Sequence, residues 1–300
     1  MLNRIKTRTF TATQTLSLLV FMALGVSFIA HAGGLVVPNT FVPGDTARAD
    51  EVNENFNTLR DAITDLQAQV ANLEQLNQLI TVSNTEINGL AGPHVIIEGA
   101  NLHLRSGSGL SDDGGTPTGL GNLVIGYNEA AGQTTADRLG AHNVIVGDQH
   151  TYTNTGGIVA GIQNTISGPG ASVLGGTNNV ASGEFATVSG GAFNQASGEE
   201  SSVTGGVSNF ATALRSAATG GAQNTVSGTA ASISGGSGGA AGGFASSISG
   251  GQSGIASGDQ SSITGGQSNS AFGDKATVGG GFNQTENNDF AWRACGLTCP

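Results

Sequence analysis

Residues 186–200 read A-T-V-S-G-G-A-F-N-Q-A-S-G-E-E, and residues 201–215 repeat the pattern as S-S-V-T-G-G-V-S-N-F-A-T-A-L-R. The first glycine of the G-G step recurs at a constant interval, at Gly175, Gly190, Gly205, Gly220, Gly235, Gly250, Gly265 and Gly280. Upstream, Gly147 and Gly161 precede Gly175 at an interval that is shorter by one. Self-similarity at a short fixed period predicts a fold made of stacked repeats.

Each repeat contains the same few residue types at the same positions. Two residues before the first glycine stands Val or Ile in all copies but one, and four residues after it stands Asn in most copies: Asn179, Asn194, Asn209, Asn224 and Asn269. Residues two apart share a strand face, so we expect a short strand with its β-branched side chain pointing inward. Asn and Gly tolerate a left-handed backbone, so we expect both at the corners.

These features predict an all-β repeat, a parallel β-roll or β-solenoid with coils of about 15 residues, over residues 121–284. A single coil buries one Val or Ile and two small side chains, which is too little to order a whole coil by itself. Stacking must therefore satisfy the backbone between successive coils, as in other solenoids. Because the core is thin, we also expect the roll to need lateral partners.

A second pattern occupies residues 46–82, which we expect to form an α-helical coiled coil. Apolar residues fall at Val52, Phe56, Leu59, Ile63, Leu66, Val70 and Leu73, with alternating spacings of four and three. This 3.5-residue period places Phe56, Ile63, Val70 and Asn77 at a positions of the heptad. The alternative is an amphipathic helix that packs on its own domain. The seam residues alone favour two strands and leave a trimer open.

The chain ends carry signals of export. Residues 1–32 read as a signal peptide, with Ala30-His31-Ala32 as the cleavage pattern, and the alternative is an uncleaved membrane anchor. The exported chain is expected at the cell surface, in the extracellular space or in the periplasm, with no membrane span after cleavage. Residues 33–45 read as a linker, 83–120 as an irregular β neck and 285–300 as a tail. In that tail Cys295 and Cys299 pair within one chain or between chains.

Composition narrows the function classes. The chain has 50 glycines, 10 basic and 21 acidic residues, and a net charge of −11, so no basic face for nucleic acid can be assembled. The segment 235–239 (G-G-S-G-G) fits a nucleophile elbow, but no histidine follows it. We expect no catalytic residue, no cofactor and no metal. Asp112 and Asp113 read as a solvated loop rather than a calcium site, and His142 and His150 as surface or packed histidines.

The segments 173–183 (V-L-G-G-T-N-N-V-A-S-G), 188–198 and 263–273 resemble the head repeats of YadA-like trimeric autotransporter adhesins. The resemblance covers about residues 120–284 and implies a homotrimer of left-handed β-rolls. In that family the stalk follows the head and the chain ends in a membrane anchor. Here the coil precedes the roll, and no anchor pattern is recognised after it.

Together these features predict an exported, non-enzymatic, homotrimeric fibrous protein with an adhesin-like head that contacts cells, matrix or glycans. The ligand is not named by the sequence. Three alternatives stay open: a purely structural fibre component, a solenoid that binds a lattice such as ice or a mineral, and a carbohydrate-active solenoid enzyme, which would need clustered acids.

Overall fold

A computed structural model describes residues 36–44, 46–130 and 132–294 of the chain. The chain divides into two units, one up to Asn101 and one from Leu102 onward. The expected signal peptide and the pair Cys295 and Cys299 lie outside the described residues.

The first unit consists of a helix and a β-hairpin. Helix α2 spans Ala49–Leu79, and strands β1 (Ile80–Ser83) and β2 (His94–Ile97) pair antiparallel, with Ile80 opposite Ile97. A helix within residues 46–82 is therefore confirmed, although it ends at Leu79, where the backbone turns extended. None of its 31 residues is buried.

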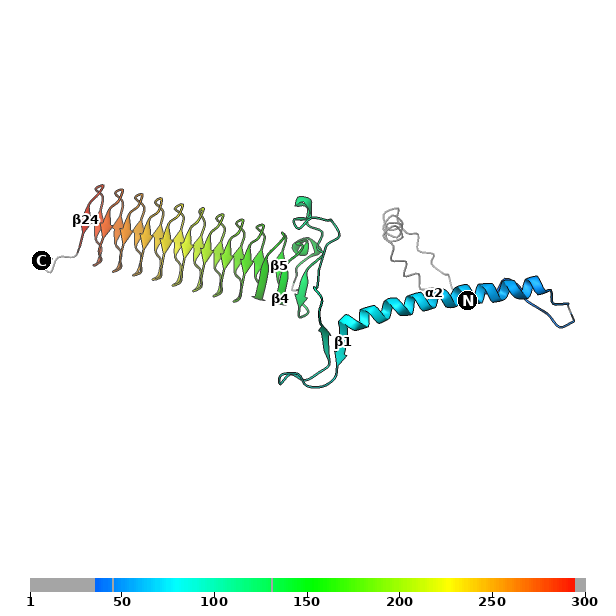
Figure 1. Ribbon diagram of the computed structural model, residues 1–300. Coiled ribbons are helices and arrows are strands. Elements are labelled where there is room, and N and C mark those ends of the chain that lie inside the picture. Colours follow the sequence, from blue (N-terminus) through cyan, green and yellow to red (C-terminus); the bar gives the residue numbers. More distant parts are fainter. Residues whose placement is uncertain (1–35, 45, 131, 295–300) are drawn as a thin grey trace, which may run out of the picture. The chain divides into compact units, whose positions relative to one another are not determined.

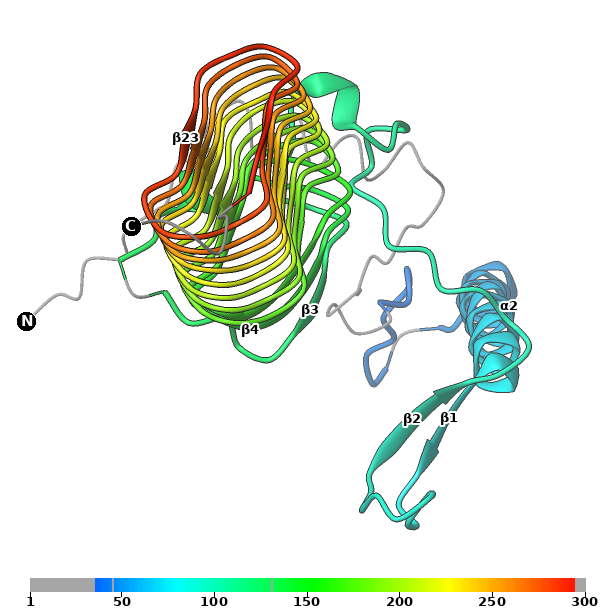
Figure 2. The same ribbon diagram turned by 90° about the vertical axis from the view of Figure 1, so that its left-hand side faces the viewer.

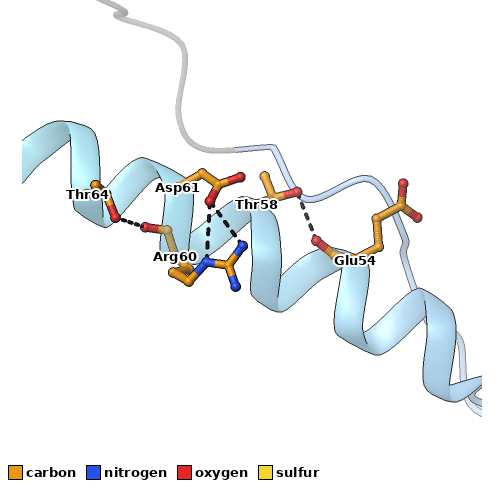
Figure 3. Close-up of polar contacts among 5 residues, drawn as sticks. All are labelled: Glu54, Thr58, Arg60, Asp61 and Thr64. Atoms are coloured by element: carbon orange, nitrogen blue, oxygen red, sulfur yellow. Dashed lines mark hydrogen bonds and ion pairs between the residues drawn. The ribbon is translucent and has the colours of Figure 1, made fainter.

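Polar side chains of α2 make hydrogen bonds and an ion pair within the helix (Figure 3). The Thr58 hydroxyl donates to the Glu54 carbonyl at 3.0 Å, and Thr64 donates likewise to Arg60 at 2.9 Å. Arg60 also pairs with Asp61 at 3.4 Å. The seventh residue of the apolar seam, Val52, is partly buried, and the other six are 40–65% exposed: Phe56, Leu59, Ile63, Leu66, Val70 and Leu73.

The segment expected as a linker folds back onto α2. The Asn39 backbone N–H donates to Asn55 Oδ1 at 2.9 Å, and Asn55 Nδ2 donates to the Asn39 carbonyl at 2.7 Å. The linker prediction was therefore wrong for this part of residues 33–45, because one asparagine on the helix satisfies both backbone groups of Asn39.

The second unit is a roll built from two parallel sheets that face each other (Figure 1). The 12-stranded sheet contains β3 (Leu123–Ile125), β4 (Val144–Asp148), β6 (Ile158–Ile162), β8 (Ser172–Val173), β10 (Thr187–Val188), β12 (Ser202–Val203), β14 (Ala217–Ala218), β16 (Ser232–Ile233), β18 (Ser247–Ile248), β20 (Ser262–Ile263), β22 (Thr277–Val278) and β24 (Trp292–Arg293). The 10-stranded sheet contains β5 (Thr151–Tyr152), β7 (Thr165–Ile166), β9 (Val180–Ala181), β11 (Gln195–Ala196), β13 (Phe210–Ala211), β15 (Thr225–Val226), β17 (Ala240–Ala241), β19 (Ile255–Ala256), β21 (Ser270–Ala271) and β23 (Thr285–Glu286). Two short 3-10 helices, η1 (Asp113–Gly115) and η2 (Thr135–Arg138), lie in the first part of this unit.

The register of the strands confirms the repeat. Thr187 lies opposite Ser172 on one side and Ser202 on the other, one full repeat away in each direction. The first turns keep the irregular spacings, since Leu123 pairs with Val144 and Val144 with Ile158. A third row of single parallel bridges, such as Thr177 with Ala192, completes each turn. Seen end-on, the turns follow nearly the same outline (Figure 2).

The core is a narrow stack of apolar side chains between the two sheets, with one row of residues from each sheet. One sheet contributes Val173, Val188, Val203, Ala218, Ile233, Ile248, Ile263 and Val278, all 0–1% exposed. The other contributes mostly alanine, which is why the roll is thin. In one turn the 12-stranded sheet contributes the smaller Ala218, and the 10-stranded sheet contributes the larger Val226 in place of alanine. The two changes compensate, so the interior of that turn stays packed.

The roll also continues beyond the predicted limit at residue 284. Strand β23 pairs in register with β21, and Trp292 of β24 lies opposite Thr277. The boundary was wrong because Trp292 and Glu286 replace the small residues of the repeat. Glu286 is 5% exposed and accepts hydrogen bonds from Asn288 and Arg293, of which the Asn288 backbone contributes most to lowering the pKa of Glu286.

Candidate functional site

The regular spacing of asparagine in the repeats builds a hydrogen-bond ladder inside the roll. Each of the predicted residues Asn179, Asn194, Asn209, Asn224 and Asn269 is 0–1% exposed. The Asn194 Nδ2 group donates to the carbonyl of Gly190 in its own turn and of Gly206 in the next, both at 3.0 Å. Its Oδ1 accepts the backbone N–H of Asn209 at 2.9 Å. One side chain therefore satisfies three backbone groups in two turns.

The prediction that these asparagines form left-handed corners was wrong. The left-handed residue is the one before each of them, with φ of 54–57° at Asn178, Phe193, Ser208, Gln223 and Ser268. The tolerance of Asn for left-handed backbone is a preference of exposed turns. Here the side chain is needed inside, because the corner leaves one carbonyl, such as that of Gly190, and one N–H group, such as that of Asn209, without a backbone partner.

The glycines divide into two kinds. At the predicted series, represented by Gly190, a Cβ would meet nothing within 4 Å, and only Gly280 of the series has positive φ. The second glycine of each pair is the constrained one: Gly191 has φ +85°, and a Cβ there would collide with the Gly206 carbonyl oxygen. The first glycine of each pair thus reveals the period of the repeat, whereas the second is the position at which the backbone requires glycine.

The ladder begins earlier than the sequence prediction, at Asn128, His150 and Asn164. The His150 N–H donates to Asn128 Oδ1 at 3.0 Å, and the Asn164 N–H donates to His150 Nδ1 at 3.3 Å. His150 Nε2 therefore carries the hydrogen and donates to the Val146 carbonyl at 3.1 Å. Burial lowers the pKa of His150 below its ordinary value of 6.5. His150 precedes Asn164 by 14 residues, which is the spacing of the first turns, and this spacing could have indicated that His150 takes the place of a ladder asparagine.

Two turns have glycine in place of the ladder side chain, at Gly239 and Gly254. The inward residue of the 12-stranded sheet is isoleucine in these turns, Ile233 and Ile248, and again in the following turn, where Ile263 is accompanied by Asn269. A Cβ at Gly239 would lie 3.5 Å from Ile233 Cδ1, and one at Gly254 would lie 3.5 Å from Ile263 Cδ1. Isoleucine methyl groups therefore lie close to the position from which the asparagine side chain extends in the other turns.

The outer surface of the 12-stranded sheet is the candidate contact surface, which we call the hydroxyl face. It consists of two columns of outward residues on six consecutive turns: Thr187, Ser189, Ser202, Thr204, Ala217, Thr219, Ser232, Ser234, Ser247, Ser249, Ser262 and Thr264. Every position except Ala217 carries a hydroxyl group. The outward positions of the other sheet are mixed, and include Phe210, Thr225 and Ile255.

All charged residues of the turns from 171 to 280 lie at one corner, two or three residues before the first column of the hydroxyl face and outside the face itself: Glu184, Glu199, Glu200, Arg215, Asp259, Asp274 and Lys275. Arg215 donates to Glu200 at 2.7 Å between adjacent turns, and this hydrogen bond lowers the pKa of Glu200. Asp259 and Asp274 each accept a backbone N–H from the preceding turn. The hydroxyl face is consequently free of charge.

The loop before the first strand of the roll is tied down by Asp113 and His142. Asp113 is 8% exposed and accepts hydrogen bonds from Ser106, Ser108 and Thr118, which lower its pKa, with Ser106 contributing most. His142 accepts the Ser106 N–H at 3.1 Å and contacts the Ser111 carbonyl at 2.9 Å. Asp113 is therefore a structural residue and not part of a solvated loop, since its hydroxyl donors occupy the carboxylate.

The segment 235–239, which fits a nucleophile elbow in the sequence, forms part of the stacked turns. Ser237, in the G-G-S-G-G segment, forms single bridges with Ala222 and Gln252 in the third row of the roll. Within the described residues, no three His, Cys, Asp or Glu side chains gather in a way that could bind a metal ion.

No protein-family model matches the chain, and no curated protein sequence matches it significantly. Across the described ranges, none of the helices combines the length and the apolar character that crossing a membrane requires.

Proposed function

We propose that this protein is an exported, homotrimeric contact protein whose roll binds an uncharged polysaccharide surface of a cell or matrix through the hydroxyl face. The observation that carries the proposal is this face itself, with hydroxyl groups at eleven of twelve outward positions and no charge.

The chemistry of the face suits an extended sugar polymer. A hydroxyl group both donates and accepts hydrogen bonds, so a regular array can pair with a partner that repeats hydroxyl groups. Neighbouring parallel strands lie about 4.8 Å apart, which supplies many weak contacts along one direction. Because the chain has a net charge of −11, a neutral polymer is favoured over a polyanionic one.

Self-association is supported by the seam of α2, and three copies rather than two are favoured by the resemblance of the roll to trimeric adhesin heads. A 31-residue helix with an exposed 3.5-residue apolar seam is stabilised when other copies cover it. Three copies would also present three hydroxyl faces, so that weak individual contacts add through multivalency.

The test compares two threonines on opposite sheets, Thr219 and Thr225, both exposed. The chain is incubated with insoluble neutral polysaccharides, and the bound fraction is measured in the pull-down. We expect Thr219→Lys to weaken binding about tenfold or more and Thr225→Lys to bind like the parent chain. Equal effects of the two variants, or no binding to any polymer, would refute the role of the hydroxyl face.

A second candidate is binding to ice, favoured by the regular spacing of the two hydroxyl columns. A mineral is disfavoured because mineral ions need charged partners, which this face lacks. Ice binding predicts thermal hysteresis that Thr219→Lys abolishes and Thr225→Lys preserves. Absence of both polysaccharide and ice binding would leave the purely structural fibre as the account of the roll.

A further inference from the structure

The N-terminal end of α2 contains an apolar pocket that is open toward solvent. Its volume is about 230 Å³, and it is lined by Val37, Phe41, Val52, Asn55, Phe56 and Leu59. Pockets for small molecules usually start at about 300 Å³, so this one is of the size that suits a single large side chain.

Four of the six lining residues form a recognisable set. Val52 and Leu59 are d positions of the heptad, Phe56 is an a position and Asn55 is a g position. In a parallel coiled coil, a side chain at a packs into a hole made by these positions of the facing helix: two d, one g and one a. The pocket is therefore a ready-made hole for a residue at an a position of another helix.

The other two lining residues come from the segment that folds back, residues 36–41, which we call the clasp. The reciprocal hydrogen bonds between Asn39 and Asn55 anchor it, and Asn39 Nδ2 also donates to the Glu51 carbonyl at 3.1 Å and to Glu54 at 2.8 Å. The clasp places Val37 and Phe41 beside the hole. The hole lies at the layer of Phe56, which is the only aromatic residue at an a position of the seam. The next two a positions are Ile63 and Val70.

We infer that the pocket receives the Phe56 ring of a second copy of this chain, in a parallel and in-register coil, and that Val37 and Phe41 are extra walls of that hole. The inference rests on the proposed self-association and deepens it, since it names the contact that sets the register.

The remaining seam residues agree with the parallel arrangement. In register, Asn77 faces Asn77 of the next copy, and the two amides can satisfy each other. In an antiparallel pair that keeps the apolar layers in contact, Asn77 would face Val52 and lose its hydrogen bonds. In register, the g and e positions bring Asn55 near Arg60 and Gln69 near Glu74, so no like charges meet.

The experiment measures self-association of the full chain by sedimentation in a urea series, with Phe41→Ala as the test variant. Val42→Ala is the matched control, because Val42 is adjacent, 55% exposed and not part of the pocket. We expect Phe41→Ala to weaken association about tenfold or more and Val42→Ala to leave it unchanged. Both changes lie outside the helix, so the seam itself is intact in each.

Orientation is tested with single cysteines in a chain that carries Cys295→Ser and Cys299→Ser. Leu73→Cys, on the seam, should form an interchain disulfide, whereas Thr64→Cys, on the outer side, should not. A chain that associates but responds equally to Phe41→Ala and Val42→Ala, or that fails to cross-link at residue 73, overturns the pocket inference alone. A chain that is monomeric at every concentration overturns the proposed self-association as well.

Discussion

The two units bury their apolar residues in opposite ways. In the roll, the row from Val173 to Val278 is 0–1% exposed, and each turn is closed by its neighbours. In α2, the seam residues from Phe56 to Leu73 are 40–65% exposed, and no residue of the helix is buried. The roll completes its own core because stacked turns satisfy both backbone and side chains within one chain. Within its unit the helix is contacted near its N-terminal end by the clasp, and most of its seam stays exposed, so we expect other copies of the chain to stabilise it.

The largest effect is expected from a charge in the core of the roll. Ile248→Asp buries an unpaired carboxylate between two sheets and should destabilise the roll by about 4 kcal/mol or more. Circular dichroism should show loss of the cooperative β transition. The counterpart in the helix, Leu66→Asp, should dissociate the chains and leave the β transition of the roll in place. A β transition lost equally in both variants would contradict the separation of the two units.

The next effect concerns the ladder. Asn194→Ala removes three hydrogen bonds and leaves the buried N–H of Asn209 unpaired, so the free energy of unfolding should fall by about 3 kcal/mol. Gln195→Ala, at the neighbouring outward position of strand β11 and partly exposed, is the control for a change outside the ladder. A urea titration measures both, and equal losses would show that the internal ladder is unimportant.

The turns without asparagine offer the reverse change. Gly239→Asn alone should destabilise the roll by about 1 kcal/mol, because the new side chain meets Asn224 Oδ1 and the methyl groups of Ile233 and Ile248. Combined with Ile233→Val and Ile248→Val, it should recover the loss and extend the ladder. The mutant cycle reports the coupling, and simple additivity of the three changes would argue against exchange of Asn for Ile in the core.

His150 predicts a pH dependence confined to the first turns. Its pKa is lowered in the folded roll, so its neutral form is favoured there and the unfolded chain binds more protons. This contribution is complete above the ordinary pKa of about 6.5 and is lost as pH falls below that value. His150→Asn introduces the residue that later turns have at this position. The melting temperature of this variant should depend less on pH between pH 7.5 and pH 5 than that of the parent chain. The same slope in parent and variant would assign the pH dependence to other groups.

The smallest effect is expected at the charged corner. Arg215 and Glu200 form an ion pair between adjacent turns, but both side chains are well exposed. Arg215→Ala should therefore leave the melting temperature of the roll unchanged within error at physiological salt. A clear drop would mean that the corner contributes to stacking beyond what its exposure suggests.

Much of the roll could be predicted from the sequence because its period is unbroken and its inward residue alternates with small ones. The last turn falls outside the prediction because Trp292 and Glu286 do not match the repeat, although the backbone still pairs at the same spacing. The role of the ladder asparagines is easily misread, since asparagine is common both in left-handed corners and where a side chain must satisfy buried backbone groups. The clasp could not be predicted at all, because it depends on one reciprocal pair, Asn39 and Asn55, with no periodic signal.

The hydroxyl face could not be identified from the sequence, because it appears only when the turns are stacked. Read along the chain, the outward residues vary among Ser, Thr, Ala and Gly. Once the turns are stacked, these residues separate into distinct surfaces, and one of them is almost uniformly hydroxylated.

The central claim is that the roll is complete within one chain and the helix is not. Sedimentation equilibrium of the purified chain tests it most directly, with Leu66→Asp as the paired sample. We predict three times the mass of one chain for the parent, and a folded monomer with an intact β spectrum for Leu66→Asp. A parent chain that is monomeric at all concentrations while α2 remains helical would contradict the account.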